Sequence, residues 1–278
     1  MDVAVNKSVE VHAGSVDYQT FGANDAPKTI VLLHASATGA WSLVPLAARL
    51  SETYRVFVPN LDGYGMSKLD CARCPATFRH VQTVERFLQA LEIESFHLVG
   101  HSMGGLIALR VARRARFDLQ SLTLIEPMAF GVLDPITDKA AIDYDRNMIN
   151  DFLSAIEAGS LEEGLSVFTE RVSDQKWADL SDRARVELMA VIPQIVEEAP
   201  LVSCDDLTGD DFSGIEVPTF LIGTENGPPP AAPIIQRIAA AIPDAEATQL
   251  AGAGHMAPIT HTADVGDAIS GFLKRSAA

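Results

Sequence analysis

Basic side chains and long apolar runs are scarce in this sequence, and each shortage excludes a class of protein. The 278 residues include 21 Lys and Arg against 37 Asp and Glu, for a formal net charge of −16. Such a chain repels nucleic acid and anionic membrane surfaces. No apolar run approaches the roughly 20 residues that a membrane span needs. We expect a small neutral or apolar molecule as the substrate and no nucleic-acid or membrane partner; the oligomeric state stays open.

Cysteine is also rare, with three in the chain. Cys71 and Cys74 form a C-x-x-C, which could be half of a zinc site or a redox pair. There is no second C-x-x-C and no nearby histidine pair, and Cys204 is far away in the sequence. We therefore interpret the cysteines as incidental thiols. The first residues lack the basic start and apolar run of a signal peptide, so we expect a cytoplasmic protein.

The negative charge is concentrated in one third of the chain. Between Gly131 and Glu216 there are 20 acidic and 6 basic side chains, which accounts for 14 of the 16 net negative charges. The residues on either side are close to neutral by the same count. A solvated, soluble surface is the simplest purpose of this charge, and it also argues against a polyanionic substrate.

The spacing Gly100-x-Ser102-x-Gly104 stands between an apolar strand at 96–99 and an Ala- and Leu-rich helix. A chain that turns from strand to helix within two residues lifts the serine hydroxyl clear of the sheet and strains the serine backbone. Side chains at positions 100 and 104 would collide with the neighbouring strand or helix, and glycine removes the collision. The free N–H groups of the helix then face any oxyanion formed at Ser102. The pattern predicts a nucleophile elbow.

Apolar strands alternate with helical patterns along most of the chain. A hairpin at 9–20 alternates apolar and polar residues, whereas 28–34, 54–58, 121–125 and 217–223 are continuous apolar runs typical of buried strands. Helical spacing covers 42–50, 77–91 and 232–241, and a closing helix runs through Phe272. Between the last two buried strands come only helical patterns, at 141–158, 161–172 and 181–198. The alternation predicts an α/β fold with a doubly wound, mostly parallel sheet and an inserted helical segment.

Together these motifs resemble the α/β-hydrolase fold of serine hydrolases, in its capped form, over nearly the whole length. The resemblance rests on the elbow, on a His34-Ala35-Ser36 loop after a buried strand, on the turn from Pro59 to Ser67, and on Gly252-Ala253-Gly254-His255. It implies a hydrolase core at 1–130 and 213–278, with a helical cap at 131–212. In the family the loop after the first buried strand gives one oxyanion-hole N–H. The resemblance therefore implies the backbone N–H groups of Ser36 and Met103 as the oxyanion hole.

A serine nucleophile needs a base, and the base needs an acid to orient it. His255 follows a Gly-rich turn after a late strand and matches the base of the family. For the acid, most members place Asp three residues after the strand that ends here at Gly223, but this position is Asn226. Another branch carries Glu after the strand that follows the elbow helix, where Glu126 stands. We predict Glu126 as the acid, with Glu225 as the alternative and His34 as a structural residue.

The predicted function is hydrolysis of a carboxylic ester or lactone through an acyl-enzyme on a Ser102-His255-Glu126 triad, without metal or organic cofactor. Serine at position 102 excludes a dehalogenase, which needs an alkylated carboxylate. Two alternatives stay open: hydrolysis of a C–C bond beside a carbonyl on the same triad, and a hydrolase-fold binding protein with little turnover. Phe130, Phe152, Phe168, Trp177 and Met189 could line the pocket or pack in the core.

Overall fold

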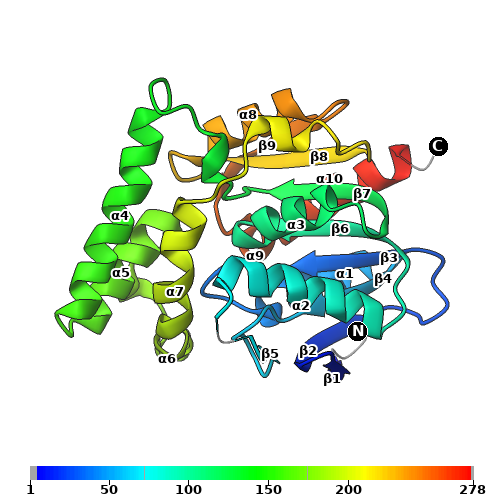
Figure 1. The fold of residues 1–278 in the computed structure, drawn as a ribbon, viewed down its shortest axis with the longest axis horizontal. Helices are drawn as coiled ribbons and strands as arrows, with labels where there is room; N and C mark the ends of the chain where they lie inside the picture. Colours follow the sequence, from blue (N-terminus) through cyan, green and yellow to red (C-terminus); the bar gives the residue numbers. More distant parts are fainter. Residues whose placement is uncertain (1–4, 72, 174, 277–278) are drawn as a thin grey trace.

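A computed structural model describes residues 5–71, 73–173 and 175–276, and is built around one twisted sheet (Figure 1). Its strands follow the order β1-β2-β4-β3-β6-β7-β8-β9, and β5 pairs with β2 beside this path. The strands are β1 (Val5–Val11), β2 (Gly14–Phe21), β3 (Thr29–Leu33), β4 (Arg55–Pro59), β5 (Lys68–Leu69), β6 (Ser95–His101), β7 (Asp118–Ile125), β8 (Thr219–Asn226) and β9 (Glu246–Gly254).

The strands with alternating residues are antiparallel at the edge of the sheet, and those with continuous apolar runs are parallel and buried, as the sequence predicts. The hairpin β1–β2 is antiparallel and lies at one edge of the sheet, where one of its faces meets solvent. From β4 onward every neighbouring pair is parallel, and strands such as β3 are almost wholly buried. Parallel strands need crossovers that cover both faces of the sheet, so continuous apolar runs are the expected composition. The α/β fold with a mostly parallel, doubly wound sheet is confirmed.

Helices cover both faces of the sheet and enclose two apolar layers. On one face Leu46 and Phe272 pack in the same buried cluster as Leu32 of β3. On the other face Phe87 and Leu106 pack with Leu33, the next residue of that strand. The helices of the first face are α1 (Val44–Leu50) and α10 (Thr262–Arg275), and those of the second are α2 (Ala76–Ala90), α3 (Met103–Arg113) and α8 (Ala231–Ala241).

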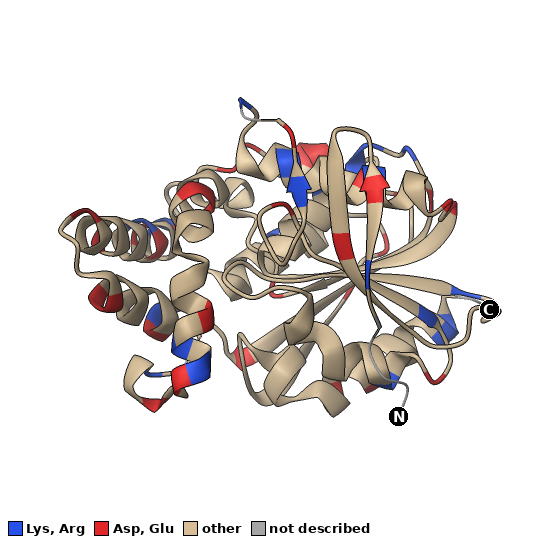
Figure 2. Ribbon diagram, turned by 90° about the horizontal axis from the view of Figure 1, so that it is seen from below, with Lys and Arg blue, Asp and Glu red and all other residues tan. Residues whose placement is uncertain are grey.

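In the described part of the segment between β7 and β8 there are four further α-helices, which lie beside the sheet at the left of Figure 1. They share an apolar cluster of their own, which includes Phe152, Leu165 and Ile195. Acidic and basic residues both occur along these helices (Figure 2). These helices are α4 (Lys139–Glu157), α5 (Leu161–Val172), α6 (Asp182–Ala190) and α7 (Ile192–Ser203). The short elements are α9 (Ala257–Thr260) and the 3₁₀ turns at Ala40–Leu43, Phe130–Val132, Trp177–Asp179 and Gly209–Phe212.

Three local predictions are wrong. The helix expected at 181–198 is two helices, α6 and α7, and Pro193 explains the break. A proline in the first turn of α7 loses no hydrogen bond, because the N–H groups of that turn have no partner within the helix. In the interior of a continuous helix the same proline would remove a hydrogen bond and clash with the preceding turn. Strand β8 does not end at Gly223; it pairs with β9 as far as Asn226, beyond a register shift. Cys71 and Cys74 are not incidental thiols, because a disulfide bond joins them, while Cys204 is free.

No helix in the described part of the chain is both long enough and apolar enough to cross a lipid bilayer.

Candidate active site

Ser102 stands at the sharp turn between β6 and α3, with its backbone in the left-handed region at φ 56°. The glycines on either side are required by close packing. A Cβ at Gly100 would lie 2.3 Å from the carbonyl oxygen of Gly104, and one at Gly104 would lie 2.4 Å from that of Leu33 on β3. Any side chain at either position would therefore force the elbow open. The turn has the geometry that the sequence spacing predicts.

Ser102, His255 and Glu126 form one chain of hydrogen bonds. Ser102 Oγ lies 2.9 Å from His255 Nε2, and His255 Nδ1 lies 3.3 Å from Glu126 Oε2. All three side chains are buried; the exposed fractions of the residues are 5%, 1% and 0%. Such a chain lets the imidazole accept the serine proton while the carboxylate fixes the ring and stabilises the imidazolium.

Glu126 follows β7 directly and is held by the neighbouring strand β8. Its Oε1 accepts hydrogen bonds from the backbone N–H of Thr224 at 2.8 Å and from Thr224 Oγ1 at 3.0 Å. Its own backbone N–H donates to the carbonyl oxygen of Ile222 on the same strand. Oε2 is therefore the oxygen left to face His255, and the carboxylate reaches it without a rearrangement.

Glu225 and Asn226, the other acid candidate and the amide at the usual acid position, are exposed at the end of β8. The Glu225 carboxylate accepts a hydrogen bond from the backbone N–H of Gly252 at 2.7 Å; this residue lies in the last part of β9, which extends to Gly254 where the sequence predicts a Gly-rich turn. The alternation of a strand sends successive side chains to opposite faces. Glu225 therefore ties the end of β8 to the last part of β9 and makes no hydrogen bond to the His255 ring.

Ser36 and Met103 both line the pocket at Ser102. Within the described residues, neither backbone N–H has an acceptor, so both are free to bind a ligand oxygen. His34 connects the Ser36 loop to the loop after β4. Its Nδ1–H donates to the carbonyl oxygen of Ala35, and its Nε2 accepts a hydrogen bond from the backbone N–H of Leu61. Burial lowers the pKa of His34 to about 4, so the ring is neutral and structural.

His101 precedes Ser102 and holds the His255 loop. Its Nε2–H donates to the backbone carbonyl oxygen of His255 at 2.8 Å, and the two rings are tilted at 43° with centroids 5.0 Å apart. Burial, together with the neighbouring His255, lowers the pKa of His101 to about 3, so its ring is neutral. The sequence places His101 beside Ser102, but nothing in its neighbourhood indicates that it holds the loop of His255.

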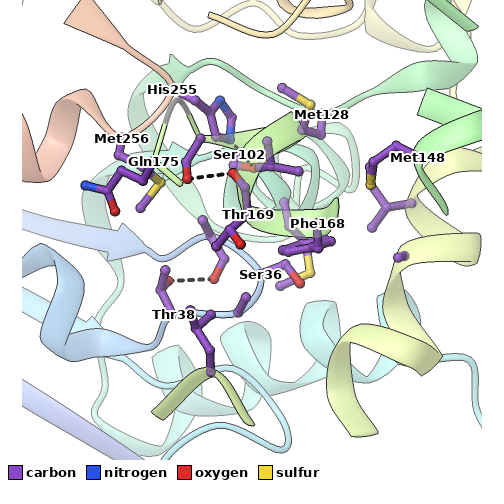
Figure 3. Close-up of a pocket in the computed structure, with 18 of the residues that line it drawn as sticks. Ser36, Thr38, Ser102, Met128, Met148, Phe168, Thr169, Gln175, His255 and Met256 are labelled. Carbon is purple, nitrogen blue, oxygen red and sulfur yellow. Dashed lines mark hydrogen bonds between the residues drawn. The ribbon is translucent and has the colours of Figure 1, made fainter. Parts of the chain in front are cut away.

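A cavity of about 180 Å³ opens beside Ser102 and His255 and is mostly apolar (Figure 3). Each of the four inserted helices contributes to its wall, for example Met148 from α4, Phe168 from α5 and Leu188 from α6. Met128 and Met256 line it from the sheet side (Figure 3). Of the aromatic and Met candidates in the sequence, Phe130 and Phe168 line the cavity, whereas Phe152 and Trp177 pack among the inserted helices and Met189 is exposed.

The charged side chains of the cavity wall are all acidic. Asp145 on α4 and Glu187 on α6 line it, and none of its described lining residues is Lys or Arg. Asp145 is 5% exposed and accepts a hydrogen bond from Ser203 Oγ. Burial raises its pKa to about 6, because a charge in an apolar wall loses its hydration. Helical spacing in the sequence could not single out this carboxylate among the many acidic residues of the segment.

Known proteins resemble this chain over part or all of its length. RutD of Pantoea ananatis (strain LMG 20103), named as a carbamate hydrolase, is 25% identical over 268 residues that cover 94% of each chain. The 2-hydroxymuconate semialdehyde hydrolase of Pseudomonas sp. (strain CF600) is 29% identical over 184 residues, 54% of this chain and 61% of that one. BODYGUARD 3 of Arabidopsis thaliana is 30% identical over 112 residues, 38% of this chain, and this chain spans only 22% of its length.

Solved structures share the fold at low identity. The enol-lactonase from Burkholderia xenovorans LB400 has a TM-score of 0.70 at 20% identity, over 96% of this chain and 100% of that one. The carboxylesterase CesB from Bacillus subtilis has a TM-score of 0.73 at 19% identity, over 98% and 92%. At these identities the likeness shows the fold alone. The model of the Alpha/beta hydrolase family matches residues 30–268, and this chain belongs to that family.

Proposed function

We propose that this chain is a serine hydrolase that cleaves carboxylic esters or lactones whose acyl group is uncharged and largely apolar. The observation that carries the proposal is the hydrogen-bonded chain from Ser102 through His255 to Glu126, with Ser102 at the floor of an apolar cavity. A serine in this setting has both a base to remove its proton and a buried carboxylate to orient the base. Membership in a hydrolase family supports the same assignment.

The proposed reaction has two halves. His255 Nε2 takes the proton of Ser102 as Oγ attacks the carbonyl carbon, and the backbone N–H groups of Ser36 and Met103 stabilise the oxyanion. The tetrahedral intermediate expels the alcohol, which takes the proton from His255 and leaves an acyl group on Ser102. A water molecule, deprotonated by the same nitrogen, then attacks the acyl carbon and releases the acid. Glu126 stays ionised and holds the His255 ring throughout.

Residues 131–212 are proposed as a cap over a core formed by 1–130 and 213–278. The four inserted helices all contribute side chains to the cavity wall, while the core contributes Ser102 and His255. The composition of α4–α7 therefore sets the substrate class. A muconate-type substrate, such as the one that the Pseudomonas relative is named for, carries a carboxylate. No described wall residue here offers that group a cationic partner, which supports the ester and lactone assignment.

The substrate class can be tested with matched substrates. Purified protein is assayed with a short p-nitrophenyl ester, a lactone, a β-diketone, and a pair of esters of equal acyl length that end in a methyl group or a carboxylate. We expect the methyl-ended ester to have the higher kcat/KM by a factor on the order of 100, because burying an unpaired carboxylate costs ~3 kcal/mol. Equal rates for the pair would contradict the neutral-substrate assignment, and no turnover of any ester or lactone would point to the binding-protein alternative.

Asp145 gives a stability prediction with a definite sign. Its pKa is raised to about 6 in the folded protein from 3.8, so the native state binds this proton more tightly than the unfolded chain does. The contribution of Asp145 to the free energy of unfolding therefore falls as pH rises from about 4 to about 6, and it stays low at higher pH. We expect Asp145→Asn to be ~2 kcal/mol more stable than wild type at pH 8, because amide replaces a desolvated charge. The gain should vanish near pH 4.

The measurement is urea unfolding of both proteins at pH 4, 6 and 8. In Asp145→Asn the amide oxygen can still accept from Ser203 Oγ, so the variant keeps that hydrogen bond and changes only the charge. Asp143, two residues earlier on α4 with a side chain that is 40% exposed, provides the control. Asp143→Asn should gain no stability over wild type between pH 4 and pH 8. A stability difference for Asp145→Asn that is equal at all three pH values would contradict the prediction.

A further inference from the structure

Helix α7 buries a carboxylate next to the Ser36 loop. Glu198 is 1% exposed and lies in the interior between α7 and the core, although it belongs to the inserted helices. Its Oε2 accepts hydrogen bonds from Ser36 Oγ at 2.7 Å and from Tyr64 Oη at 2.8 Å. Its Oε1 accepts one from His80 Nε2 at 3.0 Å. The residue takes no part in the proton transfers proposed above.

The three partners come from separate parts of the core, and each is oriented by this contact. Ser36 follows β3, Tyr64 follows β4, and His80 lies on α2. Because a carboxylate only accepts, His80 must donate through Nε2–H, and its buried Nδ1 has no partner in the described part of the chain. Three donors on one carboxylate compensate for its lost hydration, which an isolated buried charge could not do.

Tyr64 extends the contact to the next residue of the loop. Its hydroxyl donates to Glu198 and accepts the backbone N–H of Ala37 at 3.0 Å. Burial and the Glu198 charge raise the pKa of Tyr64, so the phenol stays protonated and can keep donating. Glu198 thus fixes the loop twice, through the Ser36 side chain and, by way of Tyr64, through the Ala37 backbone. Between these two anchors lies the peptide that carries the Ser36 carbonyl.

A neighbouring ion pair attaches α7 to the core without contacting the Ser36 loop. Glu197 forms a bidentate pair with Arg79 of α2, at 2.9 and 2.7 Å, and half of its side chain is exposed. This pair ties the same helix to the core but contacts neither the Ser36 loop nor the cavity wall. Adjacent carboxylates on one helix therefore make two kinds of contact, and only Glu198 reaches the residues around the Ser36 N–H.

We propose that Glu198 is a positioning residue that holds the Ser36 loop in the conformation in which its backbone N–H faces the oxyanion, so that docking of α7 completes the oxyanion hole. The inference rests on the proposed function, because it gives Ser36 its role there. A donor that is displaced by a fraction of an ångström loses much of its effect on the transition state while the substrate still binds in the apolar cavity. Loss of Glu198 should therefore lower kcat more than it changes KM.

The test compares Glu198→Ala, Glu198→Gln and the control Glu197→Ala with wild type, by ester hydrolysis and thermal unfolding. For Glu198→Ala we expect kcat to fall on the order of 30-fold with KM changed less than about 3-fold, as for a misplaced oxyanion donor. Glu198→Gln should recover most of kcat, because one amide oxygen can still accept from both Ser36 and Tyr64. Glu197→Ala should lower the unfolding temperature slightly and leave kcat unchanged.

A kcat in folded Glu198→Ala equal to that of wild type, or an equal loss in Glu197→Ala, would overturn the proposal. If Glu198→Ala does not fold, Tyr64→Phe tests the same connection, because it removes the bond to Ala37 and should also lower kcat without raising KM. Amide hydrogen exchange at residues 35–38 gives a readout that needs no turnover: it should accelerate in Glu198→Ala but not in Glu197→Ala. Wild type without activity on any ester or lactone would refute the proposed function, while the exchange result would still decide whether Glu198 fixes the loop.

Discussion

Ser102→Ala should lower ester hydrolysis by a factor on the order of 10⁵ while the protein stays folded, because loss of the nucleophile alone removes nearly all of the advantage of such a triad. The substitution removes one hydroxyl and its hydrogen bond to His255, and alanine adds no bulk at the crowded elbow. The strained φ of 56° at this position costs alanine about as much as it costs serine. The comparison is kcat/KM of both proteins on the preferred ester, with circular dichroism to verify folding.

A serine-directed phosphonate gives an independent check. It should label wild type at Ser102 alone, and peptide mapping of the labelled protein identifies the site. Ser36 serves as the internal control, because it lines the same cavity but its hydroxyl is engaged with Glu198 instead of a histidine. Labelling at Ser36, or undiminished turnover in Ser102→Ala, would refute the mechanism.

Glu126→Gln should lower turnover by a factor on the order of 10⁴, by forcing the histidine into the wrong tautomer. The amide oxygen of the new side chain would stay on Thr224, whose backbone N–H and hydroxyl both require an acceptor. The amide NH₂ would then face His255 Nδ1 and make it an acceptor. The proton would move to Nε2, the nitrogen that must take the proton of Ser102.

Glu225→Gln is the matched control for this substitution. The residue stands one position from the usual acid site, but its carboxylate is exposed. Among the described residues its one hydrogen-bond donor is the Gly252 N–H, and an amide oxygen can accept the same bond. We expect its turnover to stay within about 3-fold of wild type, as for a surface hydrogen bond. Both variants are compared at equal concentration and pH. If Glu225→Gln is the inactive one, the assignment of the acid to Glu126 is wrong.

The sequence predicts the parts of this structure that depend on short spacings. The elbow can be read from Gly100, Ser102 and Gly104 because a strand that turns sharply into a helix brings position 100 against the turn itself and position 104 against the neighbouring strand β3, which leaves room for glycine alone at both. The strands can be read because burial on both faces demands continuous apolar runs. Likewise, Glu126 and His255 are recognisable candidates because each directly follows a strand whose end lies at the same edge of the sheet.

Contacts between distant segments could not be predicted in this way. Glu198 is one of 20 acidic residues in its third of the chain, and nothing in its neighbourhood distinguishes it from Glu197. Its partners Ser36 and Tyr64 are more than 130 positions away and meet it only when α7 packs on the core. The extension of β8 past Gly223 has a similar cause, because pairing with β9 overrides a local sequence that resembles a loop.

Three imidazoles, those of His34, His101 and His255, lie close together around the elbow, and the third differs from the other two in its partner. His34 and His101 are both locked by backbone partners into one neutral tautomer, with pKa values of about 4 and about 3. Of the three, only His255 has a carboxylate at its ring. In the proposed mechanism the positive charge would therefore develop on the His255 ring alone, because the lowered pKa values of its two neighbours leave them uncharged at neutral pH and unable to share the proton taken from Ser102.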